Sequence, residues 1–225
     1  PLRLRELELP NRIVVSPMCQ YSAVDGCATN WHLVHLGQYA VSGAGLVILE
    51  ATHVERRGRI THGCLGLYSD ENEAALVRVV DFFRRHGHAR LGIQISHSGR
   101  KGSARRPWEG RGEALTAGED AWGTVSASDL PFDEGWPQPA VLDADGMAAV
   151  REAFAQSTRR AARQAQCGSC SMPRAMAARS HWPSAMTRLA CTGSNSMPTP
   201  ITGRSAGMPW AISSAEICTM FAAPI

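Results

Sequence analysis

The 225-residue chain lacks the features that would point to a membrane or a nucleic-acid partner. No stretch approaches the roughly 18 consecutive apolar residues that a membrane-spanning helix requires. Residues 1–6 contain no apolar signal core. The formal net charge of +3 is too small to predict binding to nucleic acid or to a membrane surface. We therefore expect neither of these partners.

The chain also lacks a paired set of cysteines. Its seven cysteines are an odd number, and nothing in the sequence indicates secretion. Reduced thiols are therefore expected rather than a disulfide framework, together with a cytoplasmic location. The sequence does not decide between a monomer and a homo-oligomer.

Residues 166–225 lack Val, Asp and Lys and contain a single Glu, yet they hold six of the eight Met and four of the seven Cys. A folded α/β segment normally has Val- and Ile-rich strands and charged helix faces. We therefore predict a domain over residues 1–165 and an atypical tail over residues 166–225. One explanation of this tail is a shift of the reading frame in the gene. The chain has one Lys and 22 Arg, a ratio that fits a GC-rich gene read out of frame. A genuine divergent tail is the alternative.

The first domain alternates between strand-like and helix-like patterns. Apolar runs predict strands at residues 12–16, 46–51 and 91–97. Helical spacing predicts helices at residues 31–41, 70–86 and 143–165. Such alternation is typical of parallel strands joined by right-handed crossovers, and we expect the three strands to be neighbours in sequence order.

Several finer expectations accompany these elements. Thr29 or Asn30 should cap the first helix, and Asp70 with Glu73 should cap the second. Residues 98–142 read as a long loop, which in a compact domain is usually functional or disordered. Two apolar sets are also expected to pack, one at the bottom of a barrel and one along the third helix: Leu2, Leu4, Leu7 and Leu9, and Met147, Val150, Phe154 and Thr158.

The strand over residues 91–97 alternates strictly, so Gly92, Gln94 and Ser96 share one face. A polar face on a central strand needs a partner, and a ligand is one candidate. The strand over residues 12–16 ends in Ser-Pro and opens into a loop that carries a thiol, a thioether and a phenol. An apolar strand that opens into such a loop is typical of the C-terminal face of a parallel α/β barrel.

These motifs, taken together, resemble the Old Yellow Enzyme family, and in particular its bacterial branch with a Cys beside the flavin, which includes the xenobiotic reductases. The resemblance covers residues 2–165 and stands on these segments: Asn11-Arg12-Ile13, Ser16-Pro17-Met18-Cys19-Gln20-Tyr21-Ser22, Trp31-His32-Leu33-Val34-His35-Leu36, Gly43-Ala44-Gly45-Leu46-Val47, Glu50-Ala51-Thr52, Gly58-Arg59-Ile60, Leu65-Gly66-Leu67-Tyr68-Ser69-Asp70-Glu71, Gly92-Ile93-Gln94-Ile95-Ser96-His97-Ser98-Gly99-Arg100-Lys101, Arg106-Pro107-Trp108-Glu109-Gly110 and Pro131-Phe132-Asp133-Glu134-Gly135-Trp136-Pro137.

The resemblance implies a TIM (β/α)8 barrel, here its N-terminal half, with FMN at the C-terminal ends of the strands. It also implies hydride transfer from NADPH or NADH to the flavin and then to an activated C=C bond of a small electrophilic alkene, such as an enone. By the same resemblance the flavin would be lined by Ser16, Pro17, Met18 and Cys19. The Cys19 thiol would tune the flavin as a soft, weak donor.

Three further roles follow from the resemblance. The Tyr21 phenol would donate a hydrogen bond to the substrate, and with Cys19 it forms the expected catalytic pair. The small side chain of Ala51 would let the flavin ring approach the second strand. The Gln94 carboxamide is both donor and acceptor, which matches the imide edge of a flavin. The resemblance implies no metal.

The resemblance stops near residue 166. The family has a His-x-x-His or His-x-x-Asn pair next, followed by a Tyr and later by phosphate-binding segments, and this chain shows none of them. We therefore expect an impaired enzyme. One alternative is an inactive fragment without a stable flavin site. The other is a thiol or metal protein that uses Cys167 and Cys170, which is less favoured because a second Cys-x-x-Cys is missing.

Overall fold

The structure is a computed structural model in which residues 1–166 are described. Its elements in chain order are β1 (Leu2–Leu4), β2 (Leu7–Leu9), β3 (Val14–Val15), α1 (Asn30–Ala40), β4 (Leu46–His53), η1 (Arg56–Gly58), α2 (Asp70–His86), β5 (Arg90–Ser96), η2 (Gly99–Lys101), α3 (Pro107–Gly110), η3 (Ala117–Glu119), β6 (Val125–Ser126), β7 (Ala140–Val141) and α4 (Ala144–Gln166). None of the helices in this part of the chain is both long and apolar enough to cross a lipid bilayer.

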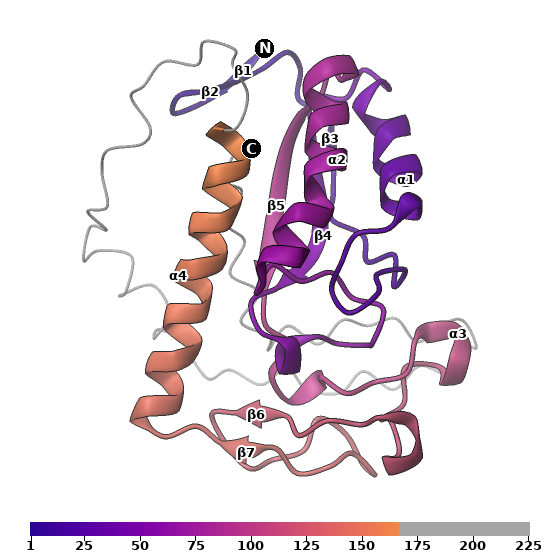
Figure 1. The fold of residues 1–225 in the computed structure, drawn as a ribbon, viewed down its shortest axis with the longest axis vertical. Coiled ribbons are helices and arrows are strands. Elements are labelled where there is room, and N and C mark those ends of the chain that lie inside the picture. Colours follow the sequence, from indigo (N-terminus) through magenta and orange to yellow (C-terminus); the bar gives the residue numbers. More distant parts are fainter. Residues whose placement is uncertain (167–225) are drawn as a thin grey trace, which may run out of the picture. The chain divides into compact units, whose positions relative to one another are not determined.

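The central sheet has three parallel strands in the order β3-β4-β5 (Figure 1). This confirms the predicted pairing, direction and order of the strands. The first strand is shorter than expected and contains only Val14 and Val15. A parallel ladder needs backbone N–H groups from each strand, and Pro17 has none to give. The chain therefore leaves the sheet just after Val15.

One face of the sheet carries the main hydrophobic core. Val47 and Leu49 of β4 and Ile93 of β5 are at most 1% exposed, and they pack against apolar residues of α1, α2 and α4. Gly92 lies on the opposite face, where a Cβ atom on this residue would contact Ile48. The two faces are therefore distinct: one packs against helices, and the other is the face that a complete barrel turns inward.

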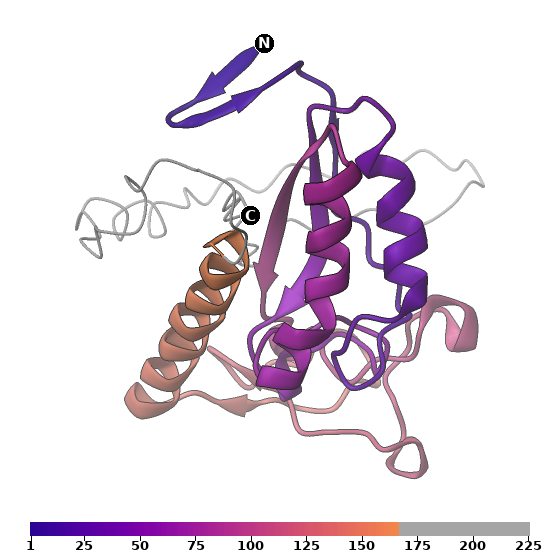
Figure 2. The same ribbon diagram turned by 45° about the horizontal axis from the view of Figure 1, so that its top comes forward.

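The N-terminal hairpin closes one end of that inward face. β1 and β2 pair antiparallel, and Leu9 is fully buried against Leu46 and Ile48 of β4. The hairpin lies at the N-terminal end of the strands in both views (Figure 1 and Figure 2). This confirms that the leucine-rich lead-in covers the bottom of the half-barrel, although Leu4 is 50% exposed and takes no part in the packing.

The helix boundaries agree with the predictions, but one cap does not. Thr29 caps α1 as expected, and Gly87 ends α2. The N-cap of α2 is Ser69, whose hydroxyl accepts a hydrogen bond from the Asn72 amide at 3.2 Å. Asp70 is therefore the first helical residue, not the cap. Its carboxylate is one of the acidic groups that favour a helix N-terminus, and it pairs with an arginine of α4.

Two further expectations need correction. Residues 98–142 were predicted as a loop, but they contain two short helical turns, the helix α3 and the parallel pair β6–β7. On α4, Phe154 packs against the main core as expected, but Met147 is 56% exposed, and the most buried residues of this helix include Ser157 and Ala161, at 1%. Ser157 donates a hydrogen bond to the Leu67 carbonyl at 3.1 Å. A polar residue of α4 therefore contacts the segment between η1 and α2.

Candidate functional site

A β-bulge in β4 organises the site. Ile48 lies opposite Gly92 in the β4–β5 ladder, but the next pair on the same face is Ala51 with Gln94. From Ile48 to Ala51, β4 advances by three residues, whereas β5 advances by only two between their partners. Glu50 is the extra residue of β4. The bulge places Ala51 and Gln94 side by side on the inward face. Sequence alternation located Gln94 on this face, but it could not show that Ala51 is its direct neighbour.

The loop after β3 supplies the other predicted side chains. Ser16 and Met18 are exposed and Pro17 is half-buried. All three lie at the C-terminal end of the sheet, where backbone groups no longer belong to the ladder. Residues in such a position are available to a ligand, because their backbone groups are not committed to strand pairing.

Cys19 lies where the loop passes the bulge. Its sulfur lies near the backbone of Ala51 in β4 and near Cys64. Burial, followed by the nearby Cys64 and Glu50, raises the pKa of Cys19 to about 12. The side chain is therefore a neutral thiol at pH 7, which suits a soft contact to a ring rather than a nucleophile.

Tyr21 adopts an unusual backbone conformation beside Cys19. Its φ angle is +50°, in the left-handed region that non-glycine residues seldom adopt. Its ring meets the Trp108 ring edge-on at 5.9 Å between centroids. Burial, followed by the nearby Cys19, raises the pKa of Tyr21 well above its usual value, so its hydroxyl keeps its proton. A protonated phenol is a hydrogen-bond donor, as the predicted role requires.

The Glu50 carboxyl is a further functional group that sequence reasoning did not identify. The side chain is 3% exposed, and its Oε2 atom accepts a hydrogen bond from the backbone N–H of Gln20 at 2.9 Å. Burial raises the pKa of Glu50 to about 8. The only signal in the sequence was a Glu at the end of an otherwise apolar strand, which reads equally well as the end of that strand.

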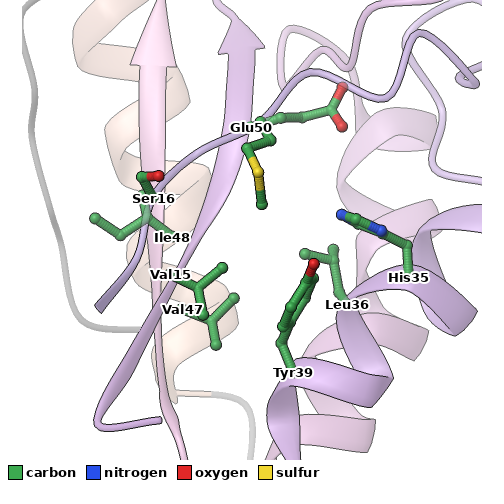
Figure 3. Close-up of a pocket in the computed structure, with 9 residues that line it drawn as sticks. Val15, Ser16, His35, Leu36, Tyr39, Val47, Ile48 and Glu50 are labelled. Atoms are coloured by element: carbon green, nitrogen blue, oxygen red, sulfur yellow. The ribbon is translucent and has the colours of Figure 1, made fainter. Parts of the chain in front are cut away.

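Two cavities lie near these residues. A small one of about 10 Å³ lies between β3 and α1, with Glu50, His35 and Tyr39 pointing towards it (Figure 3). A larger, open one of about 240 Å³ is lined by Arg56, Arg59 and Arg106, among others. Within residues 1–166, no group of three or more His, Cys, Asp or Glu side chains is placed to hold a metal ion. Cys167 and Cys170 lie outside the described residues.

The donor set on the inward face fits one edge of a flavin. Gln94 brings a carboxamide with donor and acceptor atoms, and Ala51 beside it keeps its side chain to a single methyl group. Cys19 adds a neutral thiol at the same place. Half-buried Lys101 lies close enough to lower the pKa of Cys19, so it brings positive charge to this end of the sheet. Hydrogen-bonding groups, a small residue and positive charge together suit a planar, electron-rich ring.

Comparison with known proteins identifies the family of the chain. Residues 1–168 match the model of the NADH:flavin oxidoreductase / NADH oxidase family. The chain belongs to this family, which confirms the resemblance to Old Yellow Enzyme. Two similar relatives are both named NADPH dehydrogenase. The one from Listeria monocytogenes serotype 4a is 42% identical over 74% of this chain, and the one from Geobacillus thermodenitrificans is 36% identical over 72%.

Among solved structures, the chain is similar to morphinone reductase, with a TM-score of 0.60 and 27% identity over 73% of the chain. A structure of morphinone reductase in complex with tetrahydroNAD gives a TM-score of 0.59 at 26% identity. The fold is therefore an N-terminal part of the family's TIM barrel. The chain spans about 44% of the length of the Listeria relative and 44% of the morphinone reductase chain with the TM-score of 0.60.

Proposed function

We propose that the chain is built for FMN-dependent oxidoreduction, in which NADPH or NADH supplies a hydride that passes through the flavin to an activated C=C bond. The observation that carries this proposal is the Ala51–Gln94 pair on the inward face of the sheet, with the buried Cys19 thiol near the Ala51 backbone. Bound FMN would supply the hydride chemistry itself. The family membership supports the same conclusion, since relatives carry the name NADPH dehydrogenase.

The proposal assigns each residue a distinct task. Gln94 would bind the imide edge of the flavin, Ala51 would admit the ring, and Cys19 would contact it as a neutral thiol. Ser16, Pro17 and Met18 would line the same ring from the β3 side. Tyr21 would donate a hydrogen bond to an electron-withdrawing group of the alkene. A cytoplasmic location stays a prediction, and the choice between a monomer and a homo-oligomer stays open.

We further propose that this 225-residue chain binds FMN weakly. The family resemblance assigns the flavin phosphate to segments after residue 166, and the tail sequence carries no counterpart of them. The same stretch would supply the paired donors for the substrate oxygen, and loss of one such donor costs on the order of 10²–10³ in rate elsewhere. Reduction of the alkene should therefore be slow.

The test begins with FMN binding to the purified chain, followed by quenching of flavin fluorescence and by the visible spectrum. The Gln94→Leu variant should bind FMN less tightly by about tenfold, because a buried polar edge of the flavin would lose its partner. The matched control is Gln38→Leu, at an exposed position on α1. Equal affinity for all three proteins would contradict the assignment of Gln94.

Activity is tested separately by anaerobic bleaching of the bound flavin with NADPH, then by reoxidation with cyclohexenone or maleimide. Slow bleaching and reoxidation would support the proposal. Complete absence of flavin binding at high FMN concentration would favour the alternative of an inactive fragment. Bound zinc without flavin would instead favour the thiol or metal protein that uses Cys167 and Cys170.

A further inference from the structure

Glu50 and His32 form a buried pair beneath the loop that carries Cys19 and Tyr21. The side chains of Glu50 and His32 are 3% and 0% exposed, and His32 Nε2 lies 3.9 Å from Glu50 Oε2. Within residues 1–166, Glu50 Oε1 and His32 Nε2 have no hydrogen-bond partner. A buried polar atom without a partner is costly, so two of them at one place call for an explanation.

The tautomer of His32 follows from its other nitrogen. The backbone N–H of Thr29 donates to His32 Nδ1 at 3.0 Å, so Nδ1 is an acceptor and carries no proton. Burial, with the nearby His35, lowers the pKa of His32 to about 4, so the ring is neutral at pH 7 and its proton sits on Nε2. That N–H therefore faces the Glu50 carboxyl, just beyond hydrogen-bonding distance.

The carboxyl is connected to the loop through the backbone. Glu50 Oε2 accepts a hydrogen bond from the backbone N–H of Gln20, which lies between Cys19 and Tyr21 in the chain. The pKa of both Cys19 and Tyr21 is raised in part by Glu50, so a negative charge on this carboxyl is felt by both side chains. Glu50 thus has two connections to the loop, one a hydrogen bond and one electrostatic.

We propose that Glu50 is a positioning residue for Cys19 and Tyr21, and that deprotonation of its carboxyl makes the Cys19 thiol still harder to ionise. In the neutral state the carboxyl holds the Gln20 amide and places no charge near the thiol. In the ionised state the charge opposes the thiolate and draws the His32 N–H towards Oε2. The relevance of this switch to flavin chemistry rests on the proposed function.

Among the groups of residues 1–166 that shift the pKa of Glu50, none is a positively charged side chain. Burial is the main cause of its raised pKa, which is about 8. The small cavity of about 10 Å³ beside Glu50, which His35 also lines, has roughly the volume of one water molecule. The titratable groups that face Glu50 or share its field are Cys19, Tyr21, His32, His35, Tyr39, Cys64 and Lys101.

The test measures alkylation of Cys19 by iodoacetamide from pH 6 to pH 10 in the full chain without added flavin, with each cysteine followed by peptide mass mapping. Glu50→Gln keeps an oxygen that accepts from Gln20 but removes the charge. Its Cys19 should react at the wild-type rate below pH 7 and about threefold to tenfold faster near pH 9.5. Cys27 should react equally in both proteins. Equal Cys19 rates at every pH would overturn the proposal.

A merely structural role would give a different pattern. Glu50→Ala removes both the charge and the hydrogen bond to Gln20, so its Cys19 should react faster at every pH. If Glu50→Gln showed that same uniform increase, Glu50 would only hold the loop and the proposed switch would be wrong. Because no flavin is added, these results are independent of whether FMN binds.

The wild-type protein alone gives a second measurement that requires no variant to fold. For an isolated thiol the logarithm of the alkylation rate rises by one for each pH unit below the pKa. Ionisation of Glu50 should reduce this slope below one between about pH 7.5 and pH 9 for Cys19 but not for Cys27. A slope of one for Cys19 throughout this range would contradict the proposal.

Discussion

The carbonyl oxygen of Tyr21 occupies the space that a side chain at position 63 would need. A Cβ atom on Gly63 would lie 2.1 Å from this oxygen and 2.7 Å from Arg106 Nε. The backbone of Gly63 in turn accepts a hydrogen bond from the Ala23 amide at 2.9 Å. The left-handed turn at Tyr21 is therefore packed against a glycine that no larger residue can replace without moving the loop.

Gly63→Ala should destabilise the fold by about 1–3 kcal/mol, because the added methyl group must push the Tyr21 backbone away. The measurement is urea unfolding followed by circular dichroism. Gly118→Ala is the matched control, since a Cβ atom there meets nothing within 4 Å. A Gly63→Ala variant as stable as the Gly118→Ala control would mean that the loop yields without cost.

Ser69→Ala should reduce the free energy of unfolding by about 1 kcal/mol, because the Asn72 amide would lose its capping acceptor. Ser69→Asp should retain most of the stability, since aspartate caps as well as serine does. Thermal unfolding of the three proteins makes the comparison. A loss of the same size for Ser69→Asp would show that the cap does not act through this acceptor.

The pH dependence of stability should report the buried carboxyl. The pKa of Glu50 is raised from 4.5 to about 8 in the folded chain, so between these values the folded state binds more protons than the unfolded state. Stability from this group is therefore present at low pH and lost as the pH rises towards 8, by on the order of 4 kcal/mol at most.

Glu50→Gln should remove that part of the pH dependence. Urea unfolding at pH 5, 6.5 and 8 checks this, because the difference in stability between variant and wild type should move in favour of the variant as the pH rises. Other titrating groups cancel in this difference. Parallel curves for the two proteins would indicate that Glu50 is ionised in the folded state throughout.

Cys19→Ser should change the reduction potential of bound FMN while FMN still binds, because in the proposed site the thiol would contact the ring without holding it. We expect a shift of roughly 30 mV, the two-electron equivalent of about 1.4 kcal/mol. Potentiometric titration of the FMN-loaded chain measures it, with Cys27→Ser as the control. An unchanged midpoint in Cys19→Ser would remove this residue from the functional site.

The sequence predicted the strands and helices well because their signals are local. The run at residues 46–51 is almost continuously apolar, as strands buried on both faces of a parallel sheet require, and the run at residues 91–97 alternates between apolar and other residues. The cap of α2 was misassigned to Asp70 because Ser69 and Asp70 are both good capping residues, and only the backbone angles distinguish them.

The site was predicted less completely because it depends on contacts between elements. Family resemblance supplied Ala51, Gln94 and Cys19, but the bulge that makes the first two neighbours has no sequence signature. The role of Glu50 depends on His32, which is 18 residues earlier in the chain and on another element. Pairs of this kind become visible only when the fold brings the two side chains together.

The bulge at Glu50 also separates the part of β4 that packs in the core from the part that lies beside Gln94. Before it, the alternation of β4 is dictated by packing, with Val47 and Leu49 turned to the helices. After it, the alternation restarts, so Ala51 faces Gln94 regardless of what the upstream core requires. Substitutions at residues 47 and 49 therefore act on the core packed against the helices, whereas a substitution at residue 51 acts on the inward face beside Gln94, and one extra residue in the strand separates the two.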